Sequence, residues 1–454
     1  MRPNLHLVDG PVPGYGTGSG QLLDGVVRYR ATDRLRLGGP QPDGLWEHLR
    51  RYGERPSSLG RAGAELVKTL GSVGLTGHGG AHFPTMVKWQ TVLAAGGGGY
   101  VVANAAEGEP ASAKDTALLQ HGTHLVLDGL AAAAEALAAI GSVIWLHDRA
   151  RSTYLAINRA LAERRAAGLF EPPVRVMSGP EHYLTGESSA AVNALAGGPA
   201  LPTFNRTPAA RAGLDGLPTL VQNVETLARV AILARTGGQG EQPGPLVTIA
   251  SDAVLTVCEL PPRTTLESMF RRTAGLGPPA QAPQAVLLGG YGGSWQSWSS
   301  IAHRTLGQLD GRHAARAGSR PGPHLVEPGP SLGAGVIALL PEDACGLAET
   351  AAVLDYLARS SARQCGPCVF GTRALADTMT RVVAGTARRS EFRRLTQLIG
   401  EVDGRGACGL PDGAARLART ALQVFDEDLA QHLGGGQCRH RWARPVLPIP
   451  GRDR

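Results

Sequence analysis

The chain of 454 residues has little lysine, few aromatic residues and no long uninterrupted apolar run. Of its 45 basic residues only Lys68, Lys88 and Lys114 are lysines. No basic segment alternates with aromatic residues, which argues against a nucleic-acid groove. The most apolar stretch, 125–146, contains Asp128 and Glu135, so no run reaches the ~18 residues that a membrane helix needs. The sequence therefore predicts neither nucleic-acid binding nor direct insertion into a membrane.

The net charge and the N-terminus indicate the setting of the protein. A formal charge of +7 fits a solvated basic surface or a docking face for an acidic redox partner. Residues 1–4 do not open an apolar secretory signal, so we expect a reducing cytoplasm, with the protein either free or peripheral to a membrane complex. In that compartment the cysteines, at positions 258, 345, 365, 368, 408 and 438, favour metal binding over disulfides.

The first half of the chain has the pattern of an α/β domain. Residues 1–60 are rich in Pro, Gly and Arg, with turn signals at 9–10 and 38–40. Apolar segments at 100–103, 142–146 and 174–177 predict strands, whereas helices are expected at 62–72, 125–139 and within 218–234. Because strands alternate with helices, the pattern indicates a parallel sheet.

The second half changes character after a Gly-, Gln- and Pro-rich linker at 236–245. Strands expected at 246–255 and 285–288 surround a helix at 265–273, which suggests a small α+β module ending before the Pro/Gly-rich stretch 317–334. A last strand is expected at 336–340. Amphipathic stretches then follow at 348–360, 372–384, 390–402 and 414–432 and predict a closing helical bundle.

Two cysteines, Cys365 and Cys368, are separated by a Gly-Pro pair, and Cys408 follows in a glycine-rich corner between two predicted helices. Two thiolates at this spacing can face one metal centre while the turn between them directs its N–H groups toward the sulfur atoms. The spacing alone also fits a redox dithiol or buried thiols, and zinc is the rival metal. Cys258 and Cys345 are expected to be buried structural thiols.

Further motifs occur in a fixed order along the chain. They are Gly77-His78-Gly79-Gly80-Ala81-His82-Phe83-Pro84-Thr85 with Lys88-Trp89, Asn104-Ala105-Ala106-Glu107-Gly108-Glu109-Pro110 with Lys114-Asp115, Gly186-Glu187, Gly213-Leu214 through Pro218-Thr219, Asn223-Val224-Glu225-Thr226-Leu227, Leu332-Gly333 and the three cysteines. From about residue 60 to 432 the chain thereby resembles the NADH-oxidising flavoprotein subunit of respiratory complex I. The same family includes the diaphorase subunits of NAD-reducing hydrogenases and formate dehydrogenases.

The resemblance implies a multidomain α/β protein. The expected parts are an N-terminal extension (1–60), a Rossmann-like domain for FMN and NADH (61–240), a ubiquitin-like β-grasp (SLBB) module (246–330), a helical iron–sulfur domain built as a four-helix bundle (335–437) and a tail (438–454). In relatives, hydride passes from NADH to FMN, and single electrons leave through a [4Fe-4S] cluster. The flavin converts two-electron to one-electron transfer, so no catalytic side chain is required. The expected acceptor is a ferredoxin or a thioredoxin-like [2Fe-2S] subunit.

The resemblance also assigns residues to the two cofactors. The expected FMN contacts are Gly77, Gly79, Gly80, Phe83, Lys88, Asn104, Glu107, Gly186, Glu187 and Asn223, and the expected cluster ligands are Cys365, Cys368 and Cys408. Glycines lack side chains, so backbone N–H groups can approach a phosphate or ring, and Lys88 offers a cation to a reduced flavin. Outside this context the same residues would be interpreted as a tight turn, helix caps and surface carboxylates.

The cysteine motif lacks one residue of the family pattern. The cysteine that relatives carry three residues before Cys365 is Ala362 here. Three hypotheses follow: a [4Fe-4S] cluster with a substitute ligand such as Cys438, a [3Fe-4S] cluster, or no cluster. An iron without its thiolate would be labile, and loss of an anionic sulfur would raise the reduction potential.

The nucleotide side of the expected pocket also departs from the pattern. His78 and His82 replace an arginine and a glycine, Ala106 replaces an acidic residue, and Ser188 replaces a glutamate. Three functions therefore stay open: an NADH-oxidising FMN and iron–sulfur enzyme, an FMN protein with another donor or acceptor, and a non-catalytic scaffold subunit of a redox complex.

Overall fold

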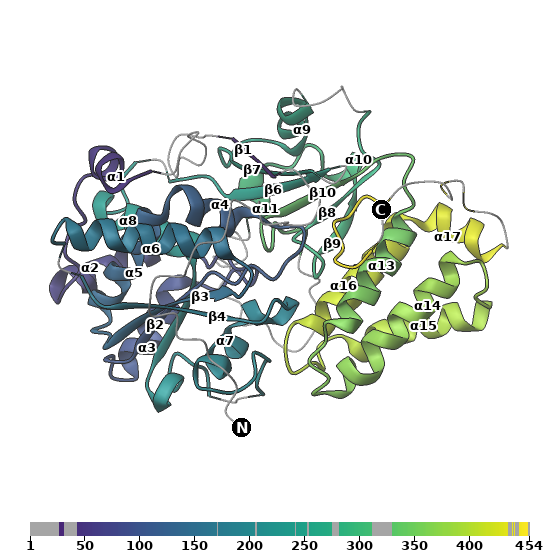
Figure 1. Ribbon diagram of the computed structural model, residues 1–454. Coiled ribbons are helices and arrows are strands. Elements are labelled where there is room, and N and C mark those ends of the chain that lie inside the picture. The colour runs from purple at the N-terminus through teal and green to yellow at the C-terminus, as the bar shows by residue number, and fades with distance from the viewer. Residues whose placement is uncertain are drawn as a thin grey trace.

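The structure, a computed structural model, describes residues 27–30 and 43–452, apart from 170, 205–206, 241, 252–253, 275–280, 311–328, 435–437, 439 and 441–444. Two sheets with flanking helices form one side of the molecule, and a group of helices late in the chain forms the other (Figure 1). The turns expected at 9–10 and 38–40 lie outside the described residues. None of the described helices is long and apolar enough to cross a membrane.

The first sheet is parallel and has the strand order β4-β3-β2-β5. Its strands are β2 (Tyr100–Asn104), β3 (Gly141–His147), β4 (Val174–Gly179) and β5 (Thr219–Asn223). The chain places β2, β3 and β4 successively in one direction and then returns to put β5 on the other side of β2. The strand order therefore reverses between β2 and β5, and the register pairs Asn104 with Asn223 at the carboxyl ends of these strands.

Helices cover both faces of this sheet. α5 and α8 pack on one face and α7 packs on the other. α5 and α8 approach closely at Gly129, where an added Cβ would lie only 1.8 Å from the carbonyl oxygen of Leu227. The helices around this sheet are α1 (Leu45–Tyr52), α2 (Arg61–Ser72), α3 (Thr85–Ala94), α4 (Lys114–His121), α5 (Thr123–Ala136), α6 (Arg151–Ala166), α7 (Ser188–Leu195) and α8 (Val224–Thr236), with the 3-10 turns η1 (Tyr183–Gly186) and η2 (Leu214–Gly216).

The second sheet is mixed and has the order β1-β7-β6-β10-β8-β9. Its strands are β1 (Val27–Arg30), β6 (Leu246–Ser251), β7 (Val254–Glu259), β8 (Ala285–Leu288), β9 (Ser294–Ser297) and β10 (Val336–Leu340), and its helices are α9 (Leu266–Ala274), α10 (Trp298–Ile301) and α11 (Leu306–Leu309). β6 and β7 form an antiparallel pair where one strand over 246–255 was expected. β1 and β10 bring segments from before residue 246 and after residue 330 into the sheet, so it extends beyond the expected module on both sides.

The last described helices are α13 (Gly346–Arg359), α14 (Thr372–Val383), α15 (Arg389–Val402), α16 (Leu410–Val424) and α17 (Asp426–Leu433), with the π-helical turn η3 (Pro367–Gly371). α13 packs against α14 and α16, and α15 packs against the same two helices (Figure 1). The stretch expected as one helix over 414–432 is two helices that meet at Phe425. α16 also packs against β9, which joins the helical group to the second sheet.

Candidate functional site

The glycine-rich loop lies where the strand order of the parallel sheet reverses. A Cβ at Gly79 would be 3.5 Å from Cβ of Asn223, so the loop passes over the end of β5. A Cβ at Gly80 would be 3.8 Å from the backbone nitrogen of Ala334, just before β10. Gly80 has a φ of +105°, which favours glycine. In open α/β sheets, ligands bind outside the carboxyl ends of the strands at such a reversal.

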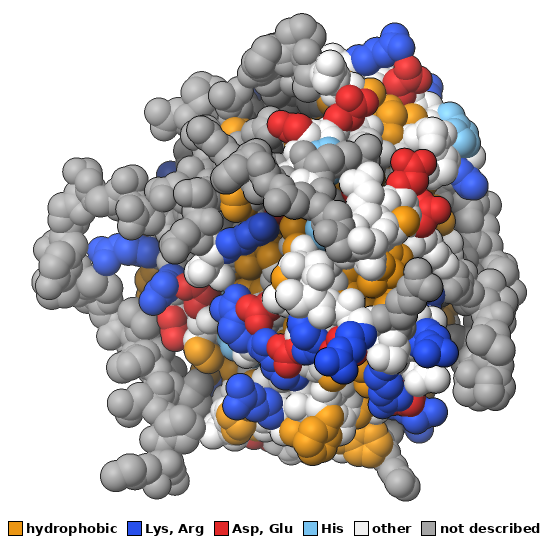
Figure 2. Space-filling view, turned by 90° about the vertical axis from the view of Figure 1, so that its right-hand side faces the viewer, with side chains coloured by type: hydrophobic (Ala, Val, Ile, Leu, Met, Phe, Trp, Pro, Cys, Tyr) orange, Lys and Arg blue, Asp and Glu red, His pale blue; other side chains and the backbone are white. Residues whose placement is uncertain are grey.

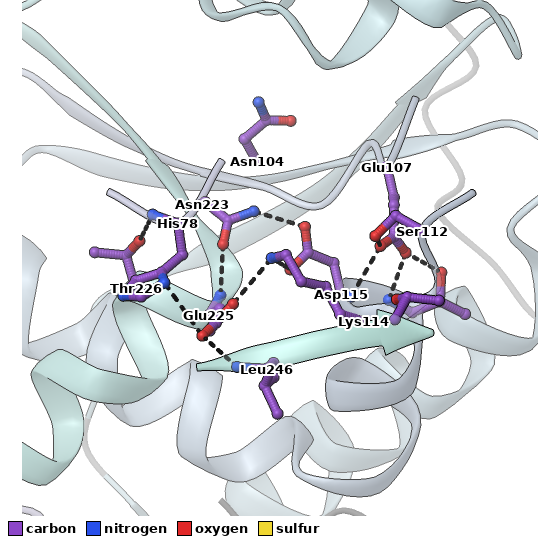
Figure 3. Close-up of polar contacts among 12 residues, drawn as sticks. His78, Asn104, Glu107, Ser112, Lys114, Asp115, Asn223, Glu225, Thr226 and Leu246 are labelled. Carbon is purple, nitrogen blue, oxygen red and sulfur yellow. Dashed lines mark hydrogen bonds and ion pairs between the residues drawn. The ribbon is translucent and has the colours of Figure 1, made fainter. Parts of the chain in front are cut away.

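Asn104 and Asn223 end the two strands at this edge, and both amides bind protein groups. The Nδ2 of Asn104 donates to the carbonyl of Gly186 at 2.7 Å. The Oδ1 of Asn223 accepts from the backbone N–H of Glu225 at 2.9 Å and so caps α8, while its Nδ2 donates to Asp115 at 2.6 Å. Asn223 turns toward a polar network beneath the loop, whereas Asn104 points away from it (Figure 3).

The expected pocket carboxylates cap helices. Glu107 accepts from the backbone N–H of Asp115 at 3.2 Å and of Thr116 at 3.0 Å, in the first turn of α4. Glu187 accepts from the backbone N–H groups of residues 189 and 190, at 2.8 and 2.9 Å, and caps α7. Both carboxylates therefore fix helix ends, whereas the sequence supported only two interpretations of them, flavin-pocket residues or ordinary surface carboxylates.

Phe83 and Lys88 follow the glycine-rich loop in the sequence. The Lys88 Nζ donates to the carbonyl of Val221 at 2.9 Å. Burial lowers the pKa of Lys88, and the Glu187 carboxylate opposes this shift. Phe83 is 49% exposed. His82, between the loop and Phe83, has a φ of +47°, a conformation more easily adopted by the glycine of the family pattern.

A buried ionic network supports the loop from below (Figure 3). Glu225 is fully buried, and its carboxylate lies 3.0 Å from Nζ of Lys114, 2.7 Å from Nη2 of Arg229 and 3.3 Å from Nδ1 of His78. Lys114 also pairs with Asp115 at 2.7 Å. This network was missed in the sequence, where Lys114 and Glu225 stand out only as motif residues. In the sequence, the only indication of this network is that Lys114, Asp115 and Glu225 belong to the family motifs.

The network has a defined charge pattern. Burial opposes ionisation of Glu225, but His78, Lys114 and Arg229 outweigh it and hold the pKa of Glu225 below its usual range. Burial also opposes the charge of Lys114, yet Asp115 and Glu225 raise the pKa of Lys114. Burial dominates at His78 and lowers its pKa, and the Glu225 carboxylate opposes this shift. The His78 side chain therefore connects the glycine loop to the buried Glu225 carboxylate.

The three predicted thiol ligands lie together beside α16. Cys365 and Cys368 hydrogen bond to each other through their thiols, and Cys408 acts electrostatically on Cys368. Burial and the two neighbouring thiols raise the pKa of Cys368 to about 12. Ala362 packs against the same small cluster but brings no ligand atom. Cys438, the hypothetical substitute ligand, instead lies beside Cys345.

The turn η1 connects the loop region with the thiols. Its last residue, Gly186, accepts the hydrogen bond from Asn104. Leu184, two residues earlier, packs with Cys368. The indole N–H of Trp145 in β3 donates to the carbonyl of Thr185 at 3.0 Å and fixes the turn to the sheet. One four-residue segment therefore contacts both sets of predicted cofactor ligands.

Two family models match the chain. The Nuo51 FMN-binding domain matches residues 70–232, and the NADH-ubiquinone oxidoreductase-F iron–sulfur binding region matches residues 348–432. The chain is 28% identical to the NADH-quinone oxidoreductase F 2 subunit of Rhizobium meliloti, over 82% of this chain and 90% of that protein. The identity to the NADH-quinone oxidoreductase F subunit of Streptomyces coelicolor is 27%, over 84% and 86% of the two chains. The chain belongs to the family of the NADH-quinone oxidoreductase flavoprotein.

The solved structure of an NAD+-reducing [NiFe]-hydrogenase in the H2-reduced state has the same fold as this member of the flavoprotein family. The TM-score is 0.69 at 23% identity, over 86% of this chain and 67% of that chain. The family models and the relatives confirm the resemblance inferred from the motifs, and the solved structure confirms the multidomain α/β architecture.

This member of the flavoprotein family exposes apolar side chains next to its thiols. Val369 and Phe370 on η3 directly follow Cys368 and are 43% and 75% exposed. A groove of about 630 Å³ beside them is lined by residues of η3, α14 and α15, including Leu398 and Val402. On the face formed by the C-terminal helices, basic and acidic side chains are intermixed and hydrophobic side chains gather along the lower edge (Figure 2).

Proposed function

We propose that this chain is the electron-entry subunit of an oxidoreductase complex, taking electrons from NADH or NADPH and passing them to sulfur-ligated iron and then to a partner protein. The observation that carries the proposal is η1, which binds Asn104 through Gly186 and packs on Cys368 through Leu184. Residues expected to hold a flavin and residues expected to hold iron thus share one rigid turn. Bound FMN would supply hydride acceptance and single-electron release.

The loop fits a flavin in its backbone and in its donor set. At Gly80 an added Cβ would meet no atom closer than 3.8 Å, so there is space beside the loop. The Oε1 of Gln222, one residue before the end of β5, is buried and has no hydrogen-bond partner among the described residues. The N-terminus of α8 lies at the same edge and favours a phosphate.

We assign the FMN contacts to the backbone of Gly77, Gly79 and Gly80 and to Lys88, Asn104 and Asn223. Phe83 and Gly186 form part of the wall. Glu107 and Glu187 hold the helix ends that border it, as their capping bonds support.

The iron site is assigned to Cys365, Cys368 and Cys408. Ala362 leaves one coordination position of a [4Fe-4S] cluster without a thiolate, so a [3Fe-4S] cluster or an exchangeable fourth ligand fits this set. No other described thiol lies in this small cluster of side chains, because Cys438 lies beside Cys345.

The finer domain assignments are also proposals. The parallel sheet and its helices form the Rossmann-like domain (61–240). β6 to β9 with α9 support the β-grasp (SLBB) module over 246–330, which β1 and β10 extend, and α13 to α16 support a four-helix bundle within 335–437. The proposed partner is a ferredoxin or a thioredoxin-like [2Fe-2S] subunit, which would dock near the exposed Phe370. The proposed compartment is the cytoplasm.

Anaerobic purification followed by absorption spectroscopy and mixing with NADH tests the proposal. We expect bound FMN, at least three irons per chain, and bleaching of the flavin by NADH. A colourless protein that binds neither FMN nor iron would favour the scaffold function and overturn the proposal.

Two glycines provide a matched pair of variants. Gly80 and Gly96 have φ values of +105° and +106°, so a side chain causes similar backbone strain at both. Only Gly80 borders the proposed site. We expect Gly80→Ala to weaken FMN binding at least about tenfold and Gly96→Ala to leave it unchanged, because only the first adds a Cβ beside the flavin. Equal affinities would remove the loop from the flavin site.

A donor other than NADH is the second candidate. Its support is His82, whose ring adds bulk at a position with φ +47° beside the loop. In this case dithionite bleaches the bound flavin but NADH and NADPH do not.

A further inference from the structure

Three metal-ligating side chains meet at a second place among the C-terminal helices. Cys345 caps the start of α13, His432 lies in the last turn of α17, and Cys438 follows that helix. The Sγ of Cys345 is 3.7 Å from Nε2 of His432. The ligand atoms of all three lie within 4.8 Å of one another, and no other trio of His, Cys, Asp or Glu in the described part of the chain was found to do so.

These separations fit one ion with short bonds. Zinc binds thiolate sulfur at about 2.3 Å and imidazole nitrogen at about 2.1 Å, so a tetrahedral angle puts the two atoms about 3.6 Å apart. The observed 3.7 Å needs almost no adjustment. The thiols of Cys365, Cys368 and Cys408 do not meet the 4.8 Å limit together, which suits a multi-iron cluster with one thiolate on each iron.

The surroundings of the three side chains also fit a metal. Cys345 and His432 are 5% and 3% exposed. Each sulfur accepts one backbone N–H at 3.4 Å, from Ala348 to Cys345 and from His440 to Cys438. The His432 ring also hydrogen bonds to the backbone of Val383, as metal-binding imidazoles commonly do.

A buried carboxylate adds negative charge next to the trio. Asp428 lies one turn before His432 on α17, is 3% exposed, and acts electrostatically on both His432 and Cys345. A divalent cation would offset the charge of two thiolates and this carboxylate in a buried place.

We propose that Cys345, His432 and Cys438 bind one zinc-type divalent cation, at a structural site separate from the flavin and the iron cluster. The site would fasten the segment after α17 to the start of α13. The end of the chain returns to the same helix, since the backbone N–H of Leu447 and the guanidinium of Arg452 both bind Glu349 of α13, at 3.0 and 2.9 Å. Metal binding would thus stabilise the packing of the C-terminal segment on α13.

Zinc binding by the full chain tests the proposal. The protein is purified anaerobically in the presence of zinc, its metals are quantified by mass spectrometry, and affinity is measured by competition with a chromophoric chelator. We expect one zinc per chain. We also expect at least about tenfold weaker binding in Cys345→Ser, Cys438→Ser and His432→Gln, because each loses a ligand. Cobalt in place of zinc should give a tetrahedral spectrum with thiolate charge transfer.

The variants separate metal loss from misfolding. Serine is a good N-cap, so Cys345→Ser keeps the acceptor for the Ala348 N–H while removing the thiolate. Cys258→Ser changes a buried thiol of β7 and should keep full zinc affinity. Cys365→Ser should reduce iron and leave zinc unchanged. If Cys345→Ser does not fold, His432→Gln decides the question.

Three results would overturn the proposal. They are zinc affinity that is unchanged in Cys345→Ser and His432→Gln, a cobalt spectrum without thiolate charge transfer, and a Cys345 to Cys438 disulfide in zinc-free protein purified anaerobically. None of these changes FMN content, so the failure of this site would be distinguishable from failure of the electron-transfer function.

Discussion

Replacing Glu225 by glutamine tests whether the buried network holds the glycine loop. The side chain is fully buried and contacts Lys114, Arg229 and His78, and its Oε1 accepts the backbone N–H of Leu246 at 3.2 Å. Glu225→Gln keeps the shape and removes the charge. Lys114 then retains only Asp115 as a carboxylate partner among these contacts, and Arg229 retains only the carbonyl oxygens of Pro243 and Gly244. Removing one partner of a buried ion pair costs about 3–5 kcal/mol.

Urea unfolding followed by circular dichroism measures this loss. With a typical slope of about 1–3 kcal/mol per M, the midpoint of the transition that involves the parallel sheet should fall by at least about 1 M. Glu267→Gln is the control, because Glu267 forms an exposed pair with Arg271 on α9 and is itself 50% exposed in its side chain. That change should alter the free energy of unfolding by no more than about 0.5 kcal/mol.

The same variant reports on the loop. His78 lies between Gly77 and Gly79, and its ring contacts Glu225, so loss of the carboxylate should also weaken FMN binding. Glu225→Gln and Glu267→Gln unfolding at the same urea concentration would refute the reasoning, because the network would then contribute no more than a surface pair.

Three further predictions rest on single positions. Ala362→Cys should add a fourth thiolate, and we expect more iron per chain and a lower reduction potential of the cluster. Iron analysis and a redox titration followed by electron paramagnetic resonance would measure these two quantities. Unchanged iron content would place Ala362 away from the cluster. Burial raises the pKa of Glu109 from 4.5 to about 7, so the folded state binds this proton more tightly and stability should fall as pH rises from about 4.5 to 7. Urea midpoints of Glu109→Gln should lack this fall, and an identical pH profile would contradict the assignment. Gly129→Ala places a Cβ 1.8 Å from a backbone oxygen and should lower the free energy of unfolding in urea by at least about 1–3 kcal/mol. Gly400→Ala in α15 is the control, because its Cβ has open space and should raise the free energy of unfolding by about 0.5–1 kcal/mol. Similar values for both variants would show that α5 and α8 do not pack so closely.

The parallel sheet was largely predictable because β2 and β3 have continuous apolar centres and β4 begins with a short, mostly apolar run. β2, β3 and β4 coincide with the expected segments to within two residues, and the central five residues of β3 are all buried. β5 was missed because Val221 continues the three-residue spacing of Val224 and Leu227. Strand and helix meet directly at Asn223, which ends β5 and caps α8. A short apolar run next to a helix has no periodicity of its own that could separate the two.

The candidate site was predictable in its residue types and less so in their partners. The motifs identified Glu107 and Glu187, but only the fold shows that their oxygens accept backbone N–H groups at helix ends. Lys114 and Glu225 are more than a hundred residues apart, as are Gly80 and Ala334, and one sequence contains no measure of such proximity. Cys438 shows the same limit, since its flexible-looking surroundings suggested the iron site and the fold places it beside Cys345.

Two departures from the family pattern, Ala106 and Ser188, lie in segments of the candidate site that backbone and capping hydrogen bonds hold in place. Ala106 replaces an acidic residue, yet its backbone N–H still binds Asn104 at 3.3 Å, and its carbonyl oxygen would be 2.2 Å from a Cβ at Gly186. Ser188 replaces a glutamate at the first position of α7, where the neighbouring Glu187 provides the cap. In this chain, the backbone contact of Ala106 and the cap from Glu187 therefore hold these segments in place without the two carboxylates. The proposed FMN contacts do not include Ala106 or Ser188, so we expect FMN binding to persist through these two changes, whereas a donor recognised at those positions would lose contacts. Under the proposed assignment, we therefore expect Ala106→Asp to alter the rate of flavin reduction by NADH without altering the affinity for FMN.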